Sequence, residues 1–307
     1  MSALLKAVDY LMLRHDSPEL QSREFRKALE SVFTHLKNPN GTWKTTRRGR
    51  HRQIDAIVLE LIRSKGLNPR VFLDIGVASG VTTAETINYF ARNGLTLYTI
   101  ATDICLDAYV AQVNTCFAVL LGPVKQPLKF EVCGLSLAPH CSRSDYLSGL
   151  AWLKKGLNVY TSWSLRDTSD LSLAAQASER QAASRPLIKG PFMLITPELQ
   201  GRSDVSIQVD NILQPPPPAL LRCADMVRIA HVLRPDRFTP AELTQAARGI
   251  RERCADNALV VVCRSNPRQR KKSTLEGTIF MADTPSGFTV LDRIGAGSEV
   301  ERYFTNL

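Results

Sequence analysis

The chain has 307 residues, of which 44% are hydrophobic, so it can bury a substantial core and is not disordered by composition. Its formal charge is +10, but nine of the positive charges lie in two clusters that contain no acid. The rest of the chain is therefore close to neutral. This argues against a nucleic-acid-binding protein coated in positive charge and favours two local anion-attracting patches. The first cluster consists of Lys44, Arg47, Arg48, Arg50 and Arg52, and the second of Arg268, Arg270, Lys271 and Lys272.

The cysteine pattern and the hydropathy indicate a protein of a reducing compartment. The seven cysteines are odd in number and no two stand at a Cys-x-x-Cys spacing, so the sequence indicates neither a disulfide framework nor a metal site. Charges interrupt the apolar residues at the N-terminus, and no run of about 18 apolar residues occurs elsewhere. We therefore expect a cytoplasmic protein without a membrane partner.

The first 66 residues predict an N-terminal helical region. Pro18 and Glu19 suit the first turn of a helix, and Asn38-Pro39-Asn40-Gly41 ends it. A second helix follows the first basic cluster and ends at Gly66, where a left-handed cap is expected. The apolar residues at helical spacing are Phe25, Leu29, Val32, Phe33 and Leu36 in the first helix, and Ile54, Ile57, Val58, Leu61 and Ile62 in the second.

Residues 67–307 predict an α/β domain with a mostly parallel, Rossmann-like sheet of seven strands, because short β-branched runs alternate with amphipathic helices. A C-terminal antiparallel hairpin is expected to close the edge of this sheet. The predicted parallel strands are 71–75, 95–104, 205–212, 225–232 and 258–263, and the hairpin strands are 278–281 and 288–291.

An insertion at about residues 122–190 separates the second and third predicted strands. It contains helical pieces at 143–155 and 171–181 and a Ser/Ala-rich, weakly hydrophobic middle. Two interpretations stay open with equal weight: a lid over an active site, or a surface elaboration.

The segment Asp74-Ile75-Gly76-Val77-Ala78-Ser79-Gly80 predicts a ligand-binding turn between a strand and a helix. Two glycines four apart let the chain turn tightly, so that a ligand can approach the backbone and the N-terminal end of the helix. An acid directly before such a turn repels a pyrophosphate. S-adenosylmethionine has no phosphate and carries a sulfonium and an ammonium, which a nearby carboxylate favours.

Asp103 ends the next predicted strand, 23 residues beyond Gly80, where a carboxylate can accept hydrogen bonds from both hydroxyls of a ribose. The alternative is that Asp103 caps the following turn. The combination of Asp74, the glycine turn and Asp103 is more specific than any one of them.

On these residues the chain resembles the class I S-adenosylmethionine-dependent methyltransferases, from Val71 to the C-terminus apart from the insertion. The resemblance implies that Asp74, Gly76 and Gly80 contact the methionine part of the cofactor and that Asp103 holds the ribose. It also implies that Asp210 and Asn211, after the third strand, read the adenine. The departure is Ala78, where many members have a glycine; alanine is small enough to be accepted there. The segment 224–233 is similar to the chemotaxis-receptor methyltransferases in particular.

His231 is the candidate catalytic base, because it follows the fourth parallel strand at the edge where acceptors bind; a histidine that only packs or orients the loop is the alternative. Arg228, within that strand, is expected either to pair with an acid or to face the substrate pocket. The basic run from Lys44 to Arg52 either binds an acidic acceptor or the cofactor carboxylate, or is a solvated loop.

The sequence favours O-methylation of a small-molecule acceptor. A methyltransferase acting on protein or RNA and a catalytically inactive cofactor-binding regulatory protein are the alternatives. No Asn-Pro-Pro-Tyr tetrapeptide follows the fourth parallel strand, and Trp43 is the sole aromatic neighbour of the basic runs, so nucleic acid is not favoured as a partner. The oligomeric state is not indicated.

Overall fold

The structure is a computed structural model that describes residues 2–14, 16–33, 36, 44, 48–178, 186–266, 274–283 and 287–307. These residues form two compact units, each made of separate stretches of chain. One unit contains the described residues of 1–47, 78–81 and 105–201, and the other contains 48–77, 82–104 and the described residues of 202–307. The predicted division at residue 66, with an insertion at 122–190, stays a prediction.

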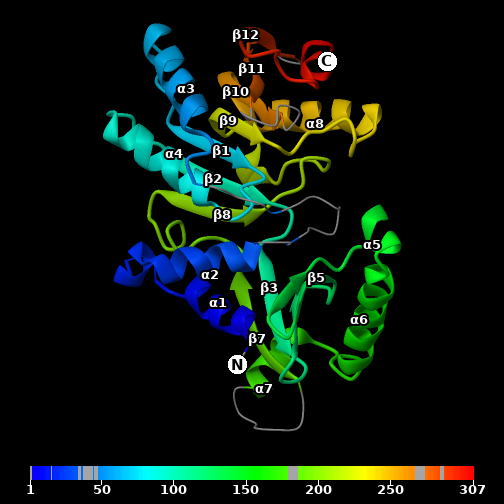
Figure 1. The fold of residues 1–307 in the computed structure, drawn as a ribbon. Coiled ribbons are helices and arrows are strands. Elements are labelled where there is room, and N and C mark those ends of the chain that lie inside the picture. The colour runs from blue at the N-terminus through cyan, green and yellow to red at the C-terminus, as the bar shows by residue number, and fades with distance from the viewer. Residues whose placement is uncertain are drawn as a thin grey trace. The chain divides into compact units, whose positions relative to one another are not determined.

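The second unit is built on a seven-stranded sheet in the order β12-β11-β10-β9-β1-β2-β8 (Figure 1). Five neighbouring strands, β10, β9, β1, β2 and β8, pair in parallel, whereas β11 pairs antiparallel with both β10 and β12. The predicted fold class, a mostly parallel sheet with antiparallel C-terminal strands after an N-terminal helical region, is confirmed. The strands are β1 (Val71–Ile75), β2 (Tyr98–Asp103), β8 (Val205–Val209), β9 (Ala224–Ala230), β10 (Cys254–Asn266), β11 (Thr274–Ala282) and β12 (Thr289–Ile294).

Helices cover both faces of this sheet because each central strand is apolar on both sides. Leu73, Val227 and Val260 pack in one core cluster with α8 (Pro240–Arg253) and α9 (Glu301–Thr305). Their chain neighbours pack in the other cluster, with α3 (Arg52–Ser64) and α4 (Val81–Arg92). A short 3-10 helix, Pro218–Leu220, precedes β9. The alternation along each strand is the period of two that directs successive side chains to opposite faces.

The first unit contains a five-stranded antiparallel sheet in the order β6-β5-β4-β3-β7, which the sequence did not predict. β3 and β4 read as continuous apolar runs, because their central residues are buried on both faces, and such runs carry no strand-specific alternation. The strands are β3 (Asp107–Gln112), β4 (Phe117–Leu121), β5 (Pro127–Val132), β6 (Leu135–Leu137) and β7 (Leu187–Met193).

The N-terminal helices belong to this first unit. The apolar face predicted for residues 25–36 is buried. The Glu131 carboxylate on β5 accepts hydrogen bonds from the backbone N–H groups of Ala3 and Leu4, at the start of the first helix of the chain. The N-terminal helices are α1 (Ala3–Leu11), the 3-10 helix Pro18–Gln21 and α2 (Arg23–Phe33), and α7 (Leu171–Ser178) is a later helix of the same unit.

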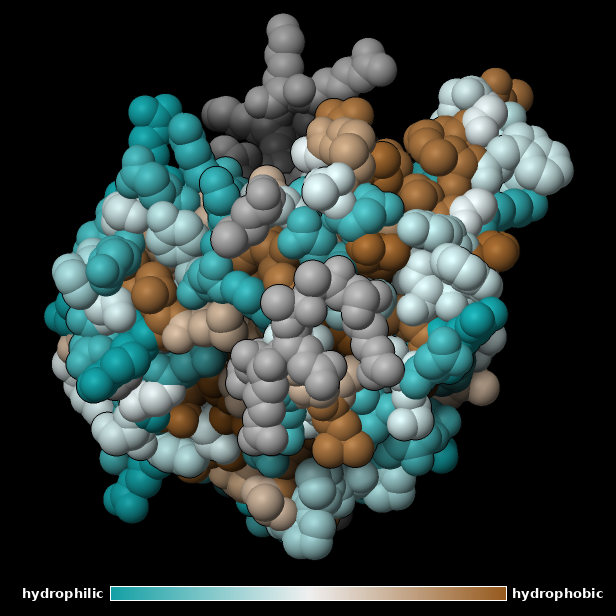
Figure 2. Space-filling view, turned by 90° about the horizontal axis from the view of Figure 1, so that it is seen from below, coloured by the Kyte–Doolittle hydropathy of each residue, from teal (hydrophilic) through white to brown (hydrophobic). Residues whose placement is uncertain are grey.

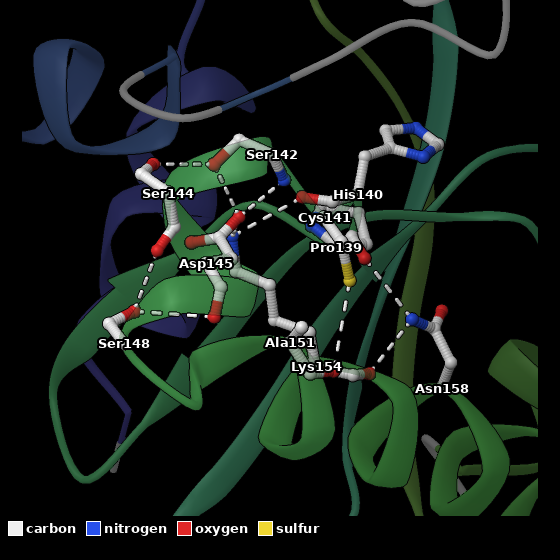
Figure 3. Close-up of polar contacts among 10 residues, drawn as sticks. All are labelled: Pro139, His140, Cys141, Ser142, Ser144, Asp145, Ser148, Ala151, Lys154 and Asn158. Atoms are coloured by element: carbon white, nitrogen blue, oxygen red, sulfur yellow. Dashed lines mark hydrogen bonds and ion pairs between the residues drawn. The ribbon is translucent and has the colours of Figure 1, made fainter.

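Two further helices, α5 (Arg143–Leu147) and α6 (Leu150–Ser164), are joined by a buried polar network (Figure 3). Lys154 Nζ lies 2.9 Å from Asp145 Oδ2 and donates to the carbonyl oxygen of His140. Asn158 Nδ2 donates to the carbonyl oxygen of Pro139. The charged side chains of Asp145 and Lys154 are therefore buried between the two helices.

Several large apolar side chains of the same helix pair are exposed. Leu147 is 91% exposed and Trp152 is 77% exposed. Figure 2 shows brown, apolar side chains on the surface at its right, on the side where Figure 1 draws α5 and α6. This is the reverse of the usual amphipathic arrangement.

Candidate functional site

The turn between β1 and α4 requires glycine for its backbone and for its packing. Gly76 and Gly80 both have φ of 74°, and Ala78 has φ of 54°, in the left-handed region that favours glycine. A Cβ atom at Gly76 would lie 2.3 Å from Val232 Cγ2, and one at Gly80 would lie 2.5 Å from Leu199 Cδ1. The space beside each glycine is therefore already filled by a protein side chain.

The amides at the start of this turn are engaged within the protein. The backbone N–H groups of Gly76 and Val77 both donate to the carbonyl oxygen of Thr102, at 2.8 and 3.1 Å. A phosphate-binding loop needs such amides to point at the ligand. The turn is therefore poorly suited to a dinucleotide pyrophosphate, in agreement with the acid that precedes it.

Three acids predicted from the sequence lie near the carboxyl ends of three adjacent parallel strands. Asp74 is the fourth residue of β1, Asp103 is the last residue of β2, and Asp210 directly follows β8. All three are buried, and the backbone N–H of Asp210 donates to the carbonyl oxygen of Asp103 at 3.1 Å. The sheet thus brings them to one edge, which is where open α/β sheets bind ligands.

The carboxylate of Asp74 is held by Arg228. Arg228 Nε and Nη2 donate to the two carboxylate oxygens at 3.0 and 2.5 Å, and Thr83 Oγ1 donates to the second oxygen at 2.6 Å. Arg228 Nη1 also donates to Asp55 on α3, at 3.3 Å, and to Thr86 on α4, at 2.5 Å. Of the two roles predicted for Arg228, pairing with an acid is the one observed. A contact between Arg228 and a substrate stays a prediction. The Arg228 side chain is only 4% exposed.

This buried cluster shifts the protonation of its members. Burial alone would lower the pKa of Arg228, but the charges of Asp74 and Asp55 raise it, so the guanidinium stays charged. Burial raises the pKa of Asp55 to about 6, against the opposite effect of Arg228. Asp55 was not singled out in the sequence, where it is one polar residue on an amphipathic helix.

Asp210 is held in the same way by a second buried arginine. Arg253, at the end of α8, donates to the two carboxylate oxygens of Asp210 at 2.9 and 2.7 Å, and its side chain is 0% exposed. Arg253 also donates to the carbonyl oxygens of Gly249, Asn211 and Gln214. Both carboxylate oxygens of Asp210 thus fix the loop after β8 to α8, and Asn211 is the exposed member of the predicted pair.

His231 follows β9 and has φ of 64°. Its Nδ1 lies 3.1 Å from Arg50 Nη2, and a guanidinium can only donate, so Nδ1 accepts and the neutral ring carries its proton on Nε2. Burial, followed by the charges of Arg50 and other arginines, lowers the pKa of His231 to about 3. In this tautomer the ring can donate a hydrogen bond through Nε2 but has no second basic nitrogen.

His51 lies against His231, with ring centroids 6.0 Å apart and the planes 14° from parallel. Burial, followed by the charges of Arg228, His231 and Arg50, lowers the pKa of His51 to about 2. The sequence reading missed His51, which stands inside a basic run and resembles a solvated loop residue there.

The structure describes part of the first basic cluster and none of the second. Lys44 is fully buried and donates to the carbonyl oxygen of Ala78, whereas Arg48 is exposed. The cluster from Arg268 to Lys272, with Arg47 and Trp43, lies outside the described residues.

Within the described ranges there is no group of three metal-ligating side chains, and none of the helices found there is long and apolar enough to cross a membrane.

Comparison with known proteins gives similarity at the level of solved structures. No known family profile and no curated protein matches the chain. The chain is similar to the CMeT domain of the citrinin polyketide synthase, with 13% identity and a TM-score of 0.34 over 86% of this chain and 48% of that one. It is also similar to the PH0226 protein from Pyrococcus horikoshii, with 12% identity and a TM-score of 0.34 over 89% and 85% of the two chains.

A third similar structure is the N-methyltransferase NodS from Bradyrhizobium japonicum in complex with S-adenosyl-L-homocysteine. Identity there is 12% and the TM-score 0.29, over 86% of this chain and 73% of that one. The chain spans about half the length of the first structures it matches. Similarity at this level does not assign the chain to a family.

Proposed function

We propose that this protein is an S-adenosylmethionine-dependent methyltransferase that acts on a small-molecule acceptor. The observation that supports this best is the acid-glycine turn at the carboxyl edge of the parallel sheet, with its first amides turned onto Thr102. The amides of Gly76 and Val77 are engaged within the protein, and Asp103 ends the neighbouring strand, which suits a cofactor that has no phosphate.

The residues at this edge of the sheet suit this cofactor, but Asp74 and Asp210 take other roles than the sequence predicted. Asp103 at the end of β2 is the proposed ribose ligand, and Asn211 is the proposed adenine contact, because the carboxylate of Asp210 is held by Arg253. Asp74 is a positioning residue: its carboxylate is tied to Arg228, so it sets the local potential and the start of the turn.

The cofactor supplies a methyl group on a sulfonium, which makes the methyl carbon electrophilic without help from the protein. The chain must align the acceptor and exclude water from it. His231 was predicted to be the base. With Nδ1 accepting from Arg50, it acts instead as a hydrogen-bond donor that orients an acceptor oxygen. An acceptor oxygen that arrives ionised needs no base, so O-methylation fits this arrangement.

Calorimetry with S-adenosylmethionine tests the proposal directly. We expect saturable binding to the full chain, weakened about tenfold or more by Asp103→Ala, because a carboxylate that accepts hydrogen bonds from two hydroxyls contributes a few kcal/mol. Asp292→Ala, at an exposed position on β12, is the matched control and should leave binding unchanged. The absence of binding, or equal binding by the two variants, would contradict the proposal.

A second candidate is a cofactor-binding regulatory protein without turnover. It is favoured by the burial of both Asp74 and Asp210 in arginine pairs and by the filled space beside Gly76 and Gly80. Formation of S-adenosyl-L-homocysteine from bound cofactor, measured with pooled small acceptors, separates the two. Binding with no product over any pool would favour the regulatory role.

A further inference from the structure

The N-terminus of α3 lies beside the two stacked histidines. His51 is the residue that precedes this thirteen-residue helix, and its side chain makes no capping hydrogen bond to the first turn. The amides at the start of a helix lack intrahelical acceptors, and the helix dipole adds a partial positive charge there. A helix start alone does not make a binding site, but two further features are found at this one.

The first feature is the imidazole of His51. The residue is only 6% exposed, and neither Nδ1 nor Nε2 has a hydrogen-bond partner among the described residues. A neutral imidazole has one N–H donor and one lone pair, and both are normally satisfied when the ring is buried. The unmet donor of His51 indicates a missing acceptor at this place.

The second feature is the charge of Arg50. Its guanidinium is half-buried and contacts Nδ1 of a neutral histidine, and no carboxylate in the described part of the chain lies within ion-pair distance of it. The carboxylate of Glu85 accepts from the backbone N–H of Gly49, the residue before Arg50. The charge of Arg50 is therefore not matched by a carboxylate of the same site.

The neighbouring arginines are different in this respect. Arg228 pairs with Asp74 and Asp55, Arg234 pairs with Asp236, and Arg264 pairs with Glu299. These arginines still raise the positive potential around His231 and lower its pKa. Their carboxylate partners offset this charge, so it is the charge of Arg50 itself that favours an anion beside the two imidazoles.

We propose that Arg50, His51 and the N-terminal turn of α3 bind the anionic oxygen group, a carboxylate or a phosphate, of a small molecule. The small molecule is the methyl acceptor, and this identification rests on the proposed function. The guanidinium of Arg50 supplies paired donors to two oxygens, and the His51 N–H supplies a further donor. His231 fixes the orientation of Arg50 through Nδ1 and stays neutral.

The experiment follows the ring resonances of His51 and His231 by NMR while the full chain is titrated with sodium benzoate and, separately, with inorganic phosphate. No methyl donor is added. We expect saturable shifts of the His51 resonance with at least one of the two anions, and the stronger one identifies the group as carboxylate or phosphate. The His51→Gln variant assigns the resonance.

Substitutions at the helix start separate a built site from general charge attraction. Arg50→Gln should weaken binding of the preferred anion about tenfold, whereas Arg50→Lys should recover part of it. Arg48→Gln, at an exposed arginine two residues away and outside α3, removes the same charge and should change the affinity less than about twofold. A melting temperature close to that of the unmodified protein confirms that each variant is folded.

Two outcomes would overturn the proposal: no shift of His51 with either anion, or equal weakening by Arg50→Gln and Arg48→Gln. Failure of the proposed function gives a different result. In that case benzoate or phosphate still binds at His51, while calorimetry finds no binding of S-adenosylmethionine.

Discussion

Arg228 remains charged in the protein interior because the carboxylates of Asp74 and Asp55 and the hydroxyl of Thr86 accept hydrogen bonds from its guanidinium. Removing one member of such a buried pair leaves the other charge without compensation. We expect Arg228→Met to lower the free energy of unfolding by about 3–5 kcal/mol, measured by urea denaturation. The loss arises from Asp74, which would keep its burial without its main donor.

An exposed ion pair in the same unit provides the control. Arg222 Nη2 lies 2.6 Å from Asp256 Oδ1, with both side chains more than half exposed. Arg222→Met should cost less than about 1 kcal/mol, because water screens the pair. Similar losses for the two variants would mean that the Arg228 cluster contributes no more than a surface pair.

The buried histidines predict a pH dependence of stability. The pKa of His51 is about 2 in the folded protein against 6.5 for an ordinary histidine, so below pH 6.5 the unfolded chain binds a proton that the folded ring does not. The free energy of unfolding therefore falls as the pH decreases from 6.5, by up to about 1.4 kcal/mol per pH unit for this ring. The lowered pKa of His231 changes the free energy of unfolding in the same direction. The charges of Arg50 and Arg228 lower the pKa of both rings, in addition to burial.

His51→Gln should flatten this slope between pH 6.5 and 4.5 in urea denaturation, and the exposed His140→Gln should not. Asp55 has the opposite sign: its pKa is raised from 3.8 to about 6, so its contribution is present at low pH and is lost as the pH rises through this window. An unchanged slope in His51→Gln would show that the ring is solvated and protonates normally.

At the scale of elements, two helical glycines make a matched pair. A Cβ atom at Gly249 in α8 would lie 2.5 Å from the carbonyl oxygen of Ile212, whereas one at Gly156 in α6 would meet no described atom within 4 Å. Alanine stabilises an open helix interior by up to about 1 kcal/mol relative to glycine. Gly156→Ala should therefore raise the stability, and Gly249→Ala should lower it by about 1–3 kcal/mol through overpacking.

The sign of these two changes is the test, measured by thermal or urea unfolding. Gly249 lets α8 approach the loop that Arg253 and Asp210 hold, so this close packing is also what positions Asn211. A stabilising Gly249→Ala would mean that the loop after β8 shifts readily and that the Arg253 pair does not fix it.

The elements that the sequence predicted are those whose pattern is local. β1 has the predicted bounds, Val71–Ile75, and the C-terminal antiparallel strands were recognised because apolar runs flank a turn-rich segment. In the sheet from β3 to β7, the strands β3 to β6 pair with their chain neighbours, and they were missed because β3 and β4 are buried on both faces and show no alternation. The pairing of β3 with β7 joins residues as distant as Ala108 and Phe192, which no local pattern records.

The same limit applies to the candidate site. The acids at 74, 103 and 210 were found because each stands at the end of a strand. Their partners Arg228 and Arg253 lie more than 40 residues from them in the chain. A sequence reading can thus place a carboxylate at the sheet edge, but it cannot tell that an arginine already occupies its oxygens.

At the scale of the whole molecule, the exposed apolar side chains are unevenly distributed. Of the fifteen large hydrophobic residues that are exposed in the described part of the chain, seven lie between Tyr146 and Trp163, on α5 and α6. A face of this kind binds apolar probes and promotes association when nothing covers it. The inward-facing pair of Lys154 and Asp145 holds the helices in this orientation.

This distribution predicts how the surface responds to mutation. The double variant Trp152→Lys and Leu147→Ser should lower the fluorescence of bound 8-anilinonaphthalene-1-sulfonate by about half and raise the concentration at which light scattering detects association, because it interrupts the apolar face. Leu221→Ser, at an isolated residue that is 54% exposed, removes a similar side chain and should leave both measurements unchanged. If the two sets of variants behaved alike, the probe would be binding elsewhere, and the exposed face of α6 would not determine how the molecule associates.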